Sequence, residues 1–223
     1  GARMPTDAGG QPVCGQCAAG QDATPRIAGF RIEREVGRGG MGRVYLARDA
    51  GGRAVALKVL VPPRGAAPVA GVVARFAREA KALQALSHPG AVTCYGAGES
   101  DGHYWLAMEF VAGLDYDQIL RTRGRVPVAE ALGVGRALCE CLTHAHQKGI
   151  VHRDIKPSNI LRADADGRPR LTDFGLARLA QQTGLSVQSM SAAGIGSPLY
   201  VPPEQILAIE NADHRSDLYA LAA

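Results

Sequence analysis

The stretch that most constrains this chain is His152–Asn159, with the sequence HRDIKPSN. It brings the carboxylate of Asp154, the ammonium of Lys156 and the carboxamide of Asn159 close together along the chain. Phosphoryl transfer needs these groups at one point: a carboxylate that accepts a hydroxyl proton, a cation beside the transferred group and an oxygen ligand for a metal. We therefore look for the other parts of such a site elsewhere in the sequence.

Composition leaves room for this chemistry and excludes other classes. With 223 residues, 46% apolar and 21% charged, the chain can bury the core of one domain or of two small lobes. The net charge of +4 comes from scattered Lys and Arg, so we expect no nucleic acid as a partner. No apolar run approaches the roughly 18 to 20 residues of a spanning helix, and residues 1–26 lack the apolar middle of a signal peptide. We expect no membrane segment in this chain and a cytoplasmic location.

Residues 1–26 are rich in Gly, Ala, Pro and Gln without apolar periodicity, which predicts a flexible linker or tail. Within it, Cys14 and Cys17 form a lone C-x-x-C pair. Such a pair is half of a zinc site, but zinc takes four ligands and no second pair follows. An inert linker is favoured, with zinc binding as the alternative. The five cysteines are odd in number and irregularly spaced, so we expect reduced thiols.

The next segment predicts a glycine-rich hairpin after a strand at residues 30–36. Gly37, Gly39 and Gly42 form G-x-G-x-x-G, a pattern that dinucleotide-binding folds also use, where it opens a helix. Here Val44 instead continues into a second strand. Backbone without side chains can lie close to phosphates and donate N–H groups to them, so the hairpin is a candidate nucleotide flap.

Lys58 stands in an otherwise apolar predicted strand at residues 54–60. It could extend to solvent from an edge strand, but a functional lysine here would need a carboxylate partner. The helix predicted from residue 72 to about residue 86 offers Glu79, one turn before Leu83 on the apolar side. We predict an ion pair between Lys58 and Glu79 that fixes the lysine for binding phosphates.

Further strands are expected at 93–96 and 103–111, and a hairpin follows Asn159. Helices are predicted at 116–123 and 128–147. Past the hairpin, Asp173 opens the triplet Asp-Phe-Gly directly after a short apolar strand. An Asp at this point, with Gly behind it to let the backbone turn, suits a magnesium ligand.

Taken in order, these motifs resemble the bacterial Hanks-type, or eukaryotic-like, serine/threonine protein kinases over about residues 30–223. The resemblance implies a two-lobed α+β fold. Residues 27–111 would form an N-lobe with a five-stranded antiparallel sheet and one helix, and residues 112–223 a mainly helical C-lobe. Family members usually continue for several more helices, so we expect the C-lobe to be incomplete and the catalytic domain to be truncated at its C-terminus. Asp217 would anchor the backbone of the catalytic loop.

The resemblance also implies a reaction, the transfer of the γ-phosphoryl group of ATP to Ser or Thr hydroxyls of proteins. Asp154 would orient and deprotonate the hydroxyl, and Lys156 would stabilise the transferred group. Asn159 and Asp173 would hold Mg²⁺, or Mn²⁺ in its place. We expect Lys58 and the two aspartates to converge on one metal-bound triphosphate.

The same resemblance implies an adenine pocket between the lobes. Met108 would be the gatekeeper at its back, and Glu109 and Val111 would offer backbone groups to the adenine edge. Ala56 and Leu161 would enclose the base from either side.

Residues 173–204 resemble an activation segment, so we predict regulation by phosphorylation. Arg153 would pair with a phosphate on this segment, and Ser189 and Ser191 stand where bacterial relatives carry phosphorylated threonines. Ser197 replaces the usual Thr but keeps the hydroxyl. A homodimer would allow autophosphorylation in trans. The plainer alternative is a flexible hydrophilic loop.

Two other classes of protein remain. A small-molecule kinase of the aminoglycoside type would tend to have Gly at the position of Arg153 and to lack the segment 173–204. A weak or inactive kinase fragment that acts as a binding or scaffold module is the second. The intact Lys58, Asp154 and Asp173 argue against a pseudokinase, whereas the missing helices would favour an inactive fragment.

Overall fold

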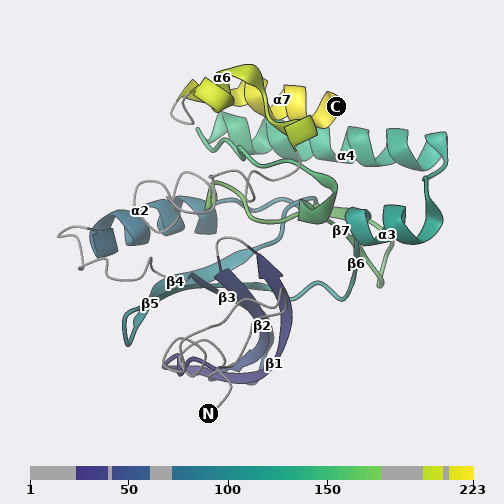
Figure 1. Cartoon of the computed structure of the whole chain (residues 1–223). Coiled ribbons are helices and arrows are strands. Elements are labelled where there is room, and N and C mark those ends of the chain that lie inside the picture. The colour runs from purple at the N-terminus through teal and green to yellow at the C-terminus, as the bar shows by residue number, and fades with distance from the viewer. Residues whose placement is uncertain (1–23, 40–41, 61–71, 177–197, 208–210) are drawn as a thin grey trace, which may run out of the picture.

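The computed structural model describes residues 24–39, 42–60, 72–176, 198–207 and 211–223. In Figure 1 a sheet lies at one end of the molecule and helices α4, α6 and α7 lie at the other. The predicted sites at Cys14, Cys17, Ser189, Ser191 and Ser197 fall outside the described residues.

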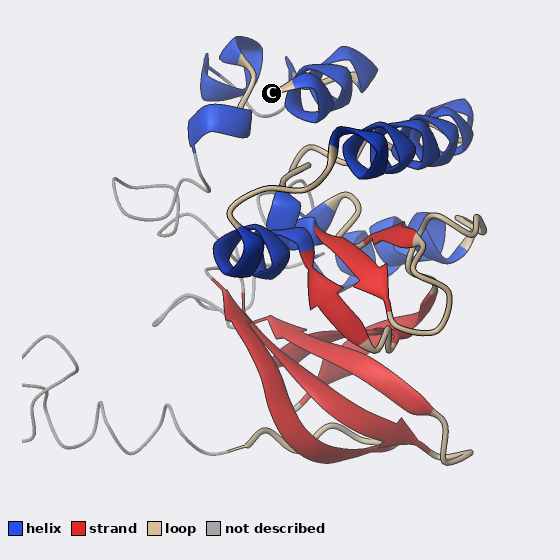
Figure 2. Ribbon diagram, turned by 90° about the vertical axis from the view of Figure 1, so that its right-hand side faces the viewer, coloured by secondary structure: helices blue, strands red, loops and turns tan. Residues whose placement is uncertain are grey.

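The sheet at the N-terminal end confirms the predicted five antiparallel strands, which are red in Figure 2. They are β1 (Phe30–Gly39), β2 (Gly42–Asp49), β3 (Ala54–Leu60), β4 (Cys94–Ser100) and β5 (His103–Glu109). Their order is β1-β2-β3-β5-β4, which puts the strand of Lys58 at the centre. Alternate side chains of β2 and β3, such as Tyr45, Val55 and Leu57, are buried in one cluster with Ile27.

Helix α2 (Val72–Gln84) forms where the sequence predicts a helix and packs against β4. Its Phe76 is 1% exposed and lies 5.1 Å from the ring of Tyr104 in β5, centroid to centroid. This contact belongs to a second apolar cluster, which also contains Leu106 and Met108. The helix is thus held to the sheet mainly by apolar contacts.

The C-terminal half is mostly helical, with one small sheet. Its elements are β6 (Gly113–Asp115), α3 (Tyr116–Arg123), α4 (Val128–Gln147), η1 (Pro157–Asn159), β7 (Ile160–Ala163), β8 (Pro169–Leu171), η2 (Pro198–Tyr200), α6 (Pro203–Leu207) and α7 (His214–Ala222). Helices α3 and α4 have the bounds that the sequence predicts. The predicted lobe boundary after residue 111 falls between β5 and β6.

Local signals explain the bounds of α3. Asp115 accepts a hydrogen bond from the backbone N–H of Gln118, and the Gln118 side chain accepts one from the N–H of Asp115. This capping box satisfies N–H groups that have no partner inside the helix. At the other end Gly124 has φ of 74°, a left-handed conformation that glycine adopts without steric cost.

The two halves are joined by main-chain hydrogen bonds between β8 and the segment before β4. Leu171 donates to the carbonyl of Gly90 at 2.8 Å, and Val92 donates to the carbonyl of Leu171 at 2.9 Å. Leu171 is fully buried in the core of the C-terminal half together with Leu138 and Leu142. The strand that leads to Asp173 is therefore tied both to the N-terminal sheet and to the helical core.

Candidate active site

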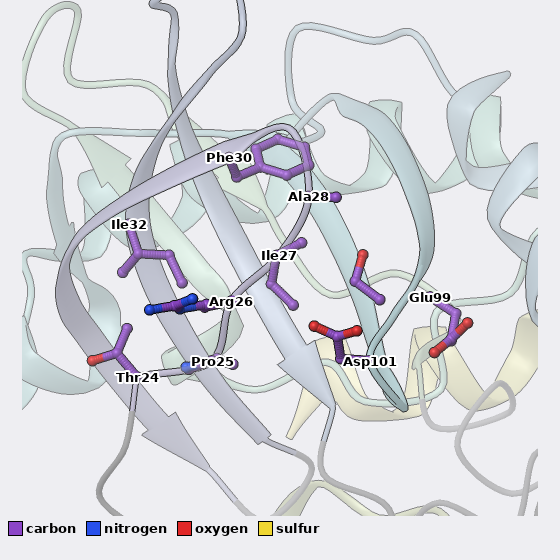
Figure 3. A pocket seen from close by; sticks show the side chains of 10 residues that line it. Thr24, Pro25, Arg26, Ile27, Ala28, Phe30, Ile32, Glu99 and Asp101 are labelled. Atoms are coloured by element: carbon purple, nitrogen blue, oxygen red, sulfur yellow. The ribbon is translucent and has the colours of Figure 1, made fainter.

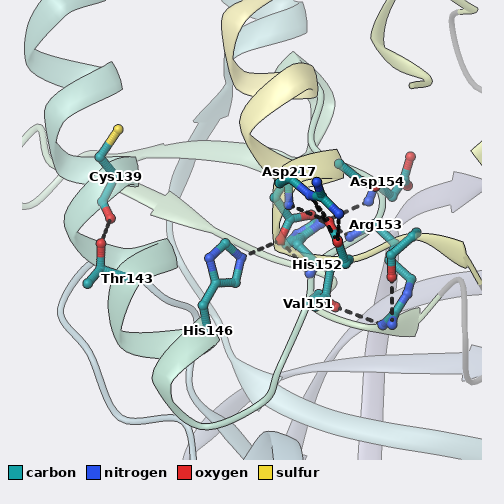
Figure 4. A network of polar contacts seen from close by, with 12 residues as sticks. Cys139, Thr143, His146, Val151, His152, Arg153, Asp154 and Asp217 are labelled. Atoms are coloured by element: carbon teal, nitrogen blue, oxygen red, sulfur yellow. Dashed lines mark hydrogen bonds and ion pairs between the residues drawn. The ribbon is translucent and has the colours of Figure 1, made fainter. Parts of the chain in front are cut away.

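The catalytic loop lies between α4 and η1 and is anchored by Asp217 of α7. The Asp217 side chain is completely buried. Its Oδ2 accepts a hydrogen bond from the backbone N–H of His152 at 2.9 Å, and its Oδ1 accepts one from the N–H of Arg153 at 2.8 Å. Figure 4 shows these bonds converging on Asp217. They are the contacts that the resemblance implies for this residue.

His146 of α4 completes this anchor. Its Nε2 lies 2.7 Å from Oδ2 of Asp217 (Figure 4). The sequence gives no local signal for this contact, because the two partners lie 71 positions apart. A buried carboxylate needs such partners, because an unpaired charge away from water costs several kcal/mol, on the order of 3 to 5.

The buried side chain of His152 helps to orient the catalytic loop. It is fully buried, its Nε2 donates to the carbonyl of Thr172 at 2.8 Å, and its Nδ1 accepts from the N–H of Asp154 at 3.2 Å. Its ring also lies 4.7 Å from the ring of Phe174, edge to face. One imidazole thus links the loop that carries Asp154 to the loop that carries Asp173.

Asp154 is held by two neighbours in the same loop. Lys156 Nζ lies 2.8 Å from Asp154 Oδ2. The Asn159 carboxamide donates to the backbone carbonyl of Asp154 at 2.7 Å and to its Oδ2 at 3.0 Å. The Asp154 side chain keeps 31% of its surface exposed, so an incoming hydroxyl can reach it. The structure therefore brings the three predicted groups of the loop together.

Lys58 and Asp173 meet across the two halves of the molecule. The Lys58 Nζ lies 2.5 Å from Asp173 Oδ2, although the residues are 115 positions apart. Lys58 is 8% exposed, so this carboxylate compensates a largely buried charge. The N–H of Thr172, next to Asp173, donates to the carbonyl of Asn159 at 3.0 Å. Asp173 is in this way placed beside both Lys58 and the catalytic loop.

The predicted ion pair between Lys58 and Glu79 is absent from this structure, where Lys58 pairs with Asp173 instead. The predicted face of the helix is nevertheless present, since Phe76 is buried and Glu79 and Leu83 are half-buried. Helical periodicity fixed the side of α2 on which Glu79 lies, but it carries no information on whether the side chain reaches Lys58. The role of Glu79 stays a prediction.

The glycines of the predicted flap lie at the hairpin between β1 and β2. Gly42 has a packing reason to be glycine: a Cβ there would lie 2.1 Å from the carbonyl oxygen of Val59 in β3. At Gly37 a Cβ would meet only Val44, at 3.9 Å. Contacts of Gly37, Gly39 and Gly42 with phosphates stay a prediction.

Four residues predicted for the adenine pocket share one apolar cluster. Met108 is 7% exposed, and three partly buried residues pack against its cluster, namely Ala56, Val111 and Leu161. Cys94 belongs to the same cluster, and burial raises the pKa of its thiol to about 11. Cys94 is therefore protonated at neutral pH and packs as a small apolar group.

Glu109, the last of the predicted adenine-pocket residues, has a side-chain partner that sequence reasoning missed. Its carboxylate binds Arg170 of β8, at 2.6 Å between Oε1 and Nη1. Its backbone N–H donates to the carbonyl of Thr93 at 2.8 Å. The sequence held no local signal for the pair with Arg170, because the partners are 61 positions apart.

Arg153 has positive φ, 68°, as does Asp173 at 65°. The left-handed conformation costs roughly 1 to 2 kcal/mol for a residue with a Cβ, and the bonds to Asp217 help to hold Arg153 in it. The guanidinium of Arg153 donates to the carbonyls of Val151 and Ala212. Its predicted pairing with a phosphorylated segment stays a prediction, because residues 177–197 are not described.

The predicted metal ligands supply oxygen atoms only, a carboxamide from Asn159 and a carboxylate from Asp173. Mg²⁺ and Mn²⁺ favour such donors. The residues present therefore fit the metal that the resemblance implies.

Another cavity lies away from these residues. A half-open hollow of about 660 Å³ is lined by residues 24–28 with Phe30 and Ile32, and by the turn Glu99–Asp101 (Figure 3). None of the predicted site residues lines it. Near the catalytic loop, a cavity of about 30 Å³ is lined by Arg153, Asp154 and Lys156, among others.

No helix among the described residues is long and apolar enough to cross a membrane.

Comparison with known proteins agrees with the geometry. The chain is 43% identical over 194 residues to serine/threonine-protein kinase pkn2 of Myxococcus xanthus, an alignment that covers 86% of this chain and 23% of pkn2. It is 43% identical over 205 residues to PknF of Mycobacterium tuberculosis, covering 88% of this chain and 42% of PknF. The chain thus spans less than half the length of these curated relatives.

A solved structure is similar as well. The kinase domain of Mycobacterium tuberculosis PknI superposes with a TM-score of 0.69 at 34% identity, covering 89% of this chain and 73% of that one. The protein kinase domain family matches residues 30–223. With the charged groups of the catalytic loop, Lys58 and Asp173 gathered in one place, the chain belongs to the protein kinase domain family.

Proposed function

We propose that this chain transfers the γ-phosphoryl group of ATP to Ser and Thr hydroxyls of proteins. The observation that carries the proposal is the meeting of Lys58 and Asp173, from opposite halves of the molecule, beside a loop in which Asp154 binds Lys156 and Asn159. The similarity to enzymes named serine/threonine-protein kinases supports this choice of acceptor.

Asp154 receives the proton of the acceptor hydroxyl. Its bonds to Lys156 and Asn159 fix the carboxylate before substrate arrives, which lowers the entropic cost of the reactive geometry. The Lys156 ammonium lies beside the same carboxylate and stabilises negative charge on the transferred group. When bound, Mg²⁺ neutralises charge on the phosphates, and Asn159 and Asp173 are the residues that would hold it.

Nucleotide binding falls to Lys58 and to the residues predicted for the flap and the adenine pocket. Lys58 contacts the phosphates, and Glu79 orients Lys58 when α2 brings it within reach. The glycine hairpin covers the phosphates, and the backbone of Glu109 and Val111 contacts the adenine edge. Because this chemistry consumes ATP, we place the chain in the cytoplasm.

Regulation is proposed to act through the segment after Asp173. Phosphate on Ser189 or Ser191 would pair with Arg153, and two copies of the chain would phosphorylate each other. The hydroxyl of Ser197 would contact the catalytic loop. A scaffold without activity is less well supported, because every charged group that the chemistry needs is present in the described loop and strand.

The proposal is tested by incubating the protein with Mg-ATP and locating phosphate by mass spectrometry. We expect phosphate on Ser189 or Ser191 in the wild type. Asp154→Asn should lower the rate of transfer by about 10²- to 10⁴-fold, because the proton acceptor is lost. Lys58→Met should also remove the label.

Asp164→Asn is the matched control, an exposed aspartate in the turn between β7 and β8, and it should transfer phosphate at the wild-type rate. Undiminished transfer by Asp154→Asn would refute the assignment of Asp154.

A further inference from the structure

A partly buried ion pair joins the end of β5 to β8. Glu109 Oε1 and Arg170 Nη1 lie 2.6 Å apart, and the two side chains keep only 25% and 23% of their surface exposed. A short, charge-assisted hydrogen bond of this kind is stronger than an exposed ion pair, because little water competes for its atoms.

Glu109 is fixed on its other side by the segment before β4. Its N–H donates to the carbonyl of Thr93 at 2.8 Å, and its Oε2 accepts from the N–H of Thr93 at 3.3 Å. Arg170 is therefore the contact that connects this anchored residue to the small sheet of the C-terminal half.

Arg170 lies on β8, close to two other residues of the proposed site. It lies opposite Leu161 of β7 and precedes Asp173 by three residues. Its Nη2 lies 3.6 Å from Asp166 Oδ2, and its Nε is buried without a hydrogen-bond partner among the described residues. A guanidinium in such a place depends on its carboxylate partner, so the position of β8 is coupled to that of Glu109.

We propose that Glu109 and Arg170 form a positioning pair that sets the distance between the base end and the phosphate end of the nucleotide site. This inference rests on the proposed function. By the proposed function, the backbone of Glu109 would contact the adenine, Leu161 would pack against the base, and Asp173 would hold the metal. The pair links Glu109 to β8, which pairs with the strand of Leu161 and leads to Asp173. Neither side chain touches the transferred phosphoryl group, so the pair acts on nucleotide binding more than on the chemical step.

The test is the affinity for Mg-ATP, measured by isothermal titration calorimetry, together with KM for ATP and kcat. Arg170→Met and Glu109→Gln should each raise Kd and KM about tenfold, the loss expected for one charge-assisted bond, and should change kcat by less than about twofold. The double variant should bind no more weakly than either single variant, because both remove the same contact.

Two further variants separate positioning from general stability. Arg170→Lys should restore Kd to within about threefold of the wild type, because one N–O contact joins the pair and an ammonium can supply it. Arg168→Met removes an exposed arginine that precedes β8 and lies 4.0 Å from the same Asp166, and it should leave Kd unchanged.

Unchanged Kd in both Arg170→Met and Glu109→Gln would overturn the proposal, as would an equal rise in Arg168→Met. A lower melting temperature without a change in Kd would also overturn it, since the pair would then be structural only. A wild-type protein that binds Mg-ATP without transferring phosphate would defeat the proposed kinase activity alone, whereas one that binds no nucleotide would defeat both.

Discussion

The two sides of the candidate site are held in different ways. On the side of the catalytic loop, the completely buried Asp217 receives hydrogen bonds from two backbone N–H groups and contacts His146. On the side of α2, Glu79 is half-buried and makes no ion pair with Lys58, which binds Asp173. The catalytic loop is therefore held by buried hydrogen bonds that also stabilise the fold. The position of Glu79, in contrast, depends on how α2 packs against the sheet through apolar contacts.

This difference separates stability from activity. A change at the buried anchor should lower the free energy of unfolding and the rate together, because the same bonds serve both. A change at Glu79 should leave the free energy of unfolding nearly constant and act on the rate alone. The following variants test that separation, and the last position, His88, lies in the turn that follows α2 and has His144 of α4 beside it.

The largest effect is expected for Asp217→Ala. Removing the carboxylate leaves the N–H groups of His152 and Arg153 buried without their partner, so we expect a loss of about 3 to 5 kcal/mol in the free energy of unfolding. Urea denaturation followed by circular dichroism measures it. Asp213→Ala, at the exposed N-cap of the same helix, should cost clearly less. Equal losses in the two variants would contradict the anchor.

An intermediate effect, confined to the rate, is expected for Glu79→Gln. The free energy of unfolding should change by less than about 0.5 kcal/mol, because Glu79 makes no ion pair with Lys58 in this structure. The rate of phosphoryl transfer should nevertheless fall about tenfold if Glu79 orients Lys58 during turnover.

Lys81→Gln, an exposed change on the same helix, is the control and should affect neither quantity. A Glu79→Gln variant with the wild-type rate would remove Glu79 from the site, and the α2 side would then contribute packing only.

The smallest effect is a pH dependence at His88, in the turn between α2 and β4. Burial, and then the neighbouring His144 on α4, lower the pKa of His88, while Glu140 on α4 acts in the opposite direction. The neutral ring fits the fold, since Nδ1 accepts a hydrogen bond from the N–H of Gly90 at 3.0 Å.

A lowered pKa means that the unfolded chain binds the proton more readily. Stability is therefore complete above the ordinary histidine pKa of about 6.5 and declines as the pH falls through that value toward the lower folded pKa. Urea denaturation at several pH values measures the decline. His88→Asn should flatten this part of the profile, and an unchanged profile would exclude His88 as its source.

Much of the fold could be predicted because its signals are local. Asp115, Gln118 and Gly124 bound α3 through interactions within a few residues, and the alternation of buried residues marks β2 and β3. Strand β6 was missed because three residues are too few to show a period, and its pairing with β7 is non-local.

The candidate site could be predicted residue by residue but not contact by contact. The motifs around Asp154, Asn159 and Asp173 marked which residues gather, and the structure brings them together. The partner of Lys58 and the pair of Glu109 with Arg170 depend on the relative placement of distant elements. Periodicity fixes the face of a helix or strand, but tertiary packing decides what a long side chain reaches.

The close approach of Gly42 to β3 bears on how mutational scans of this hairpin should be interpreted. With the carbonyl of Val59 only 2.1 Å from where a methyl group would sit, even alanine would push two neighbouring strands apart. A scan scored by growth or signal output would then record position 42 as intolerant whether or not the loop ever touches a ligand. Soluble yield, measured beside catalysis for each variant, tells a failed sheet from a failed enzyme.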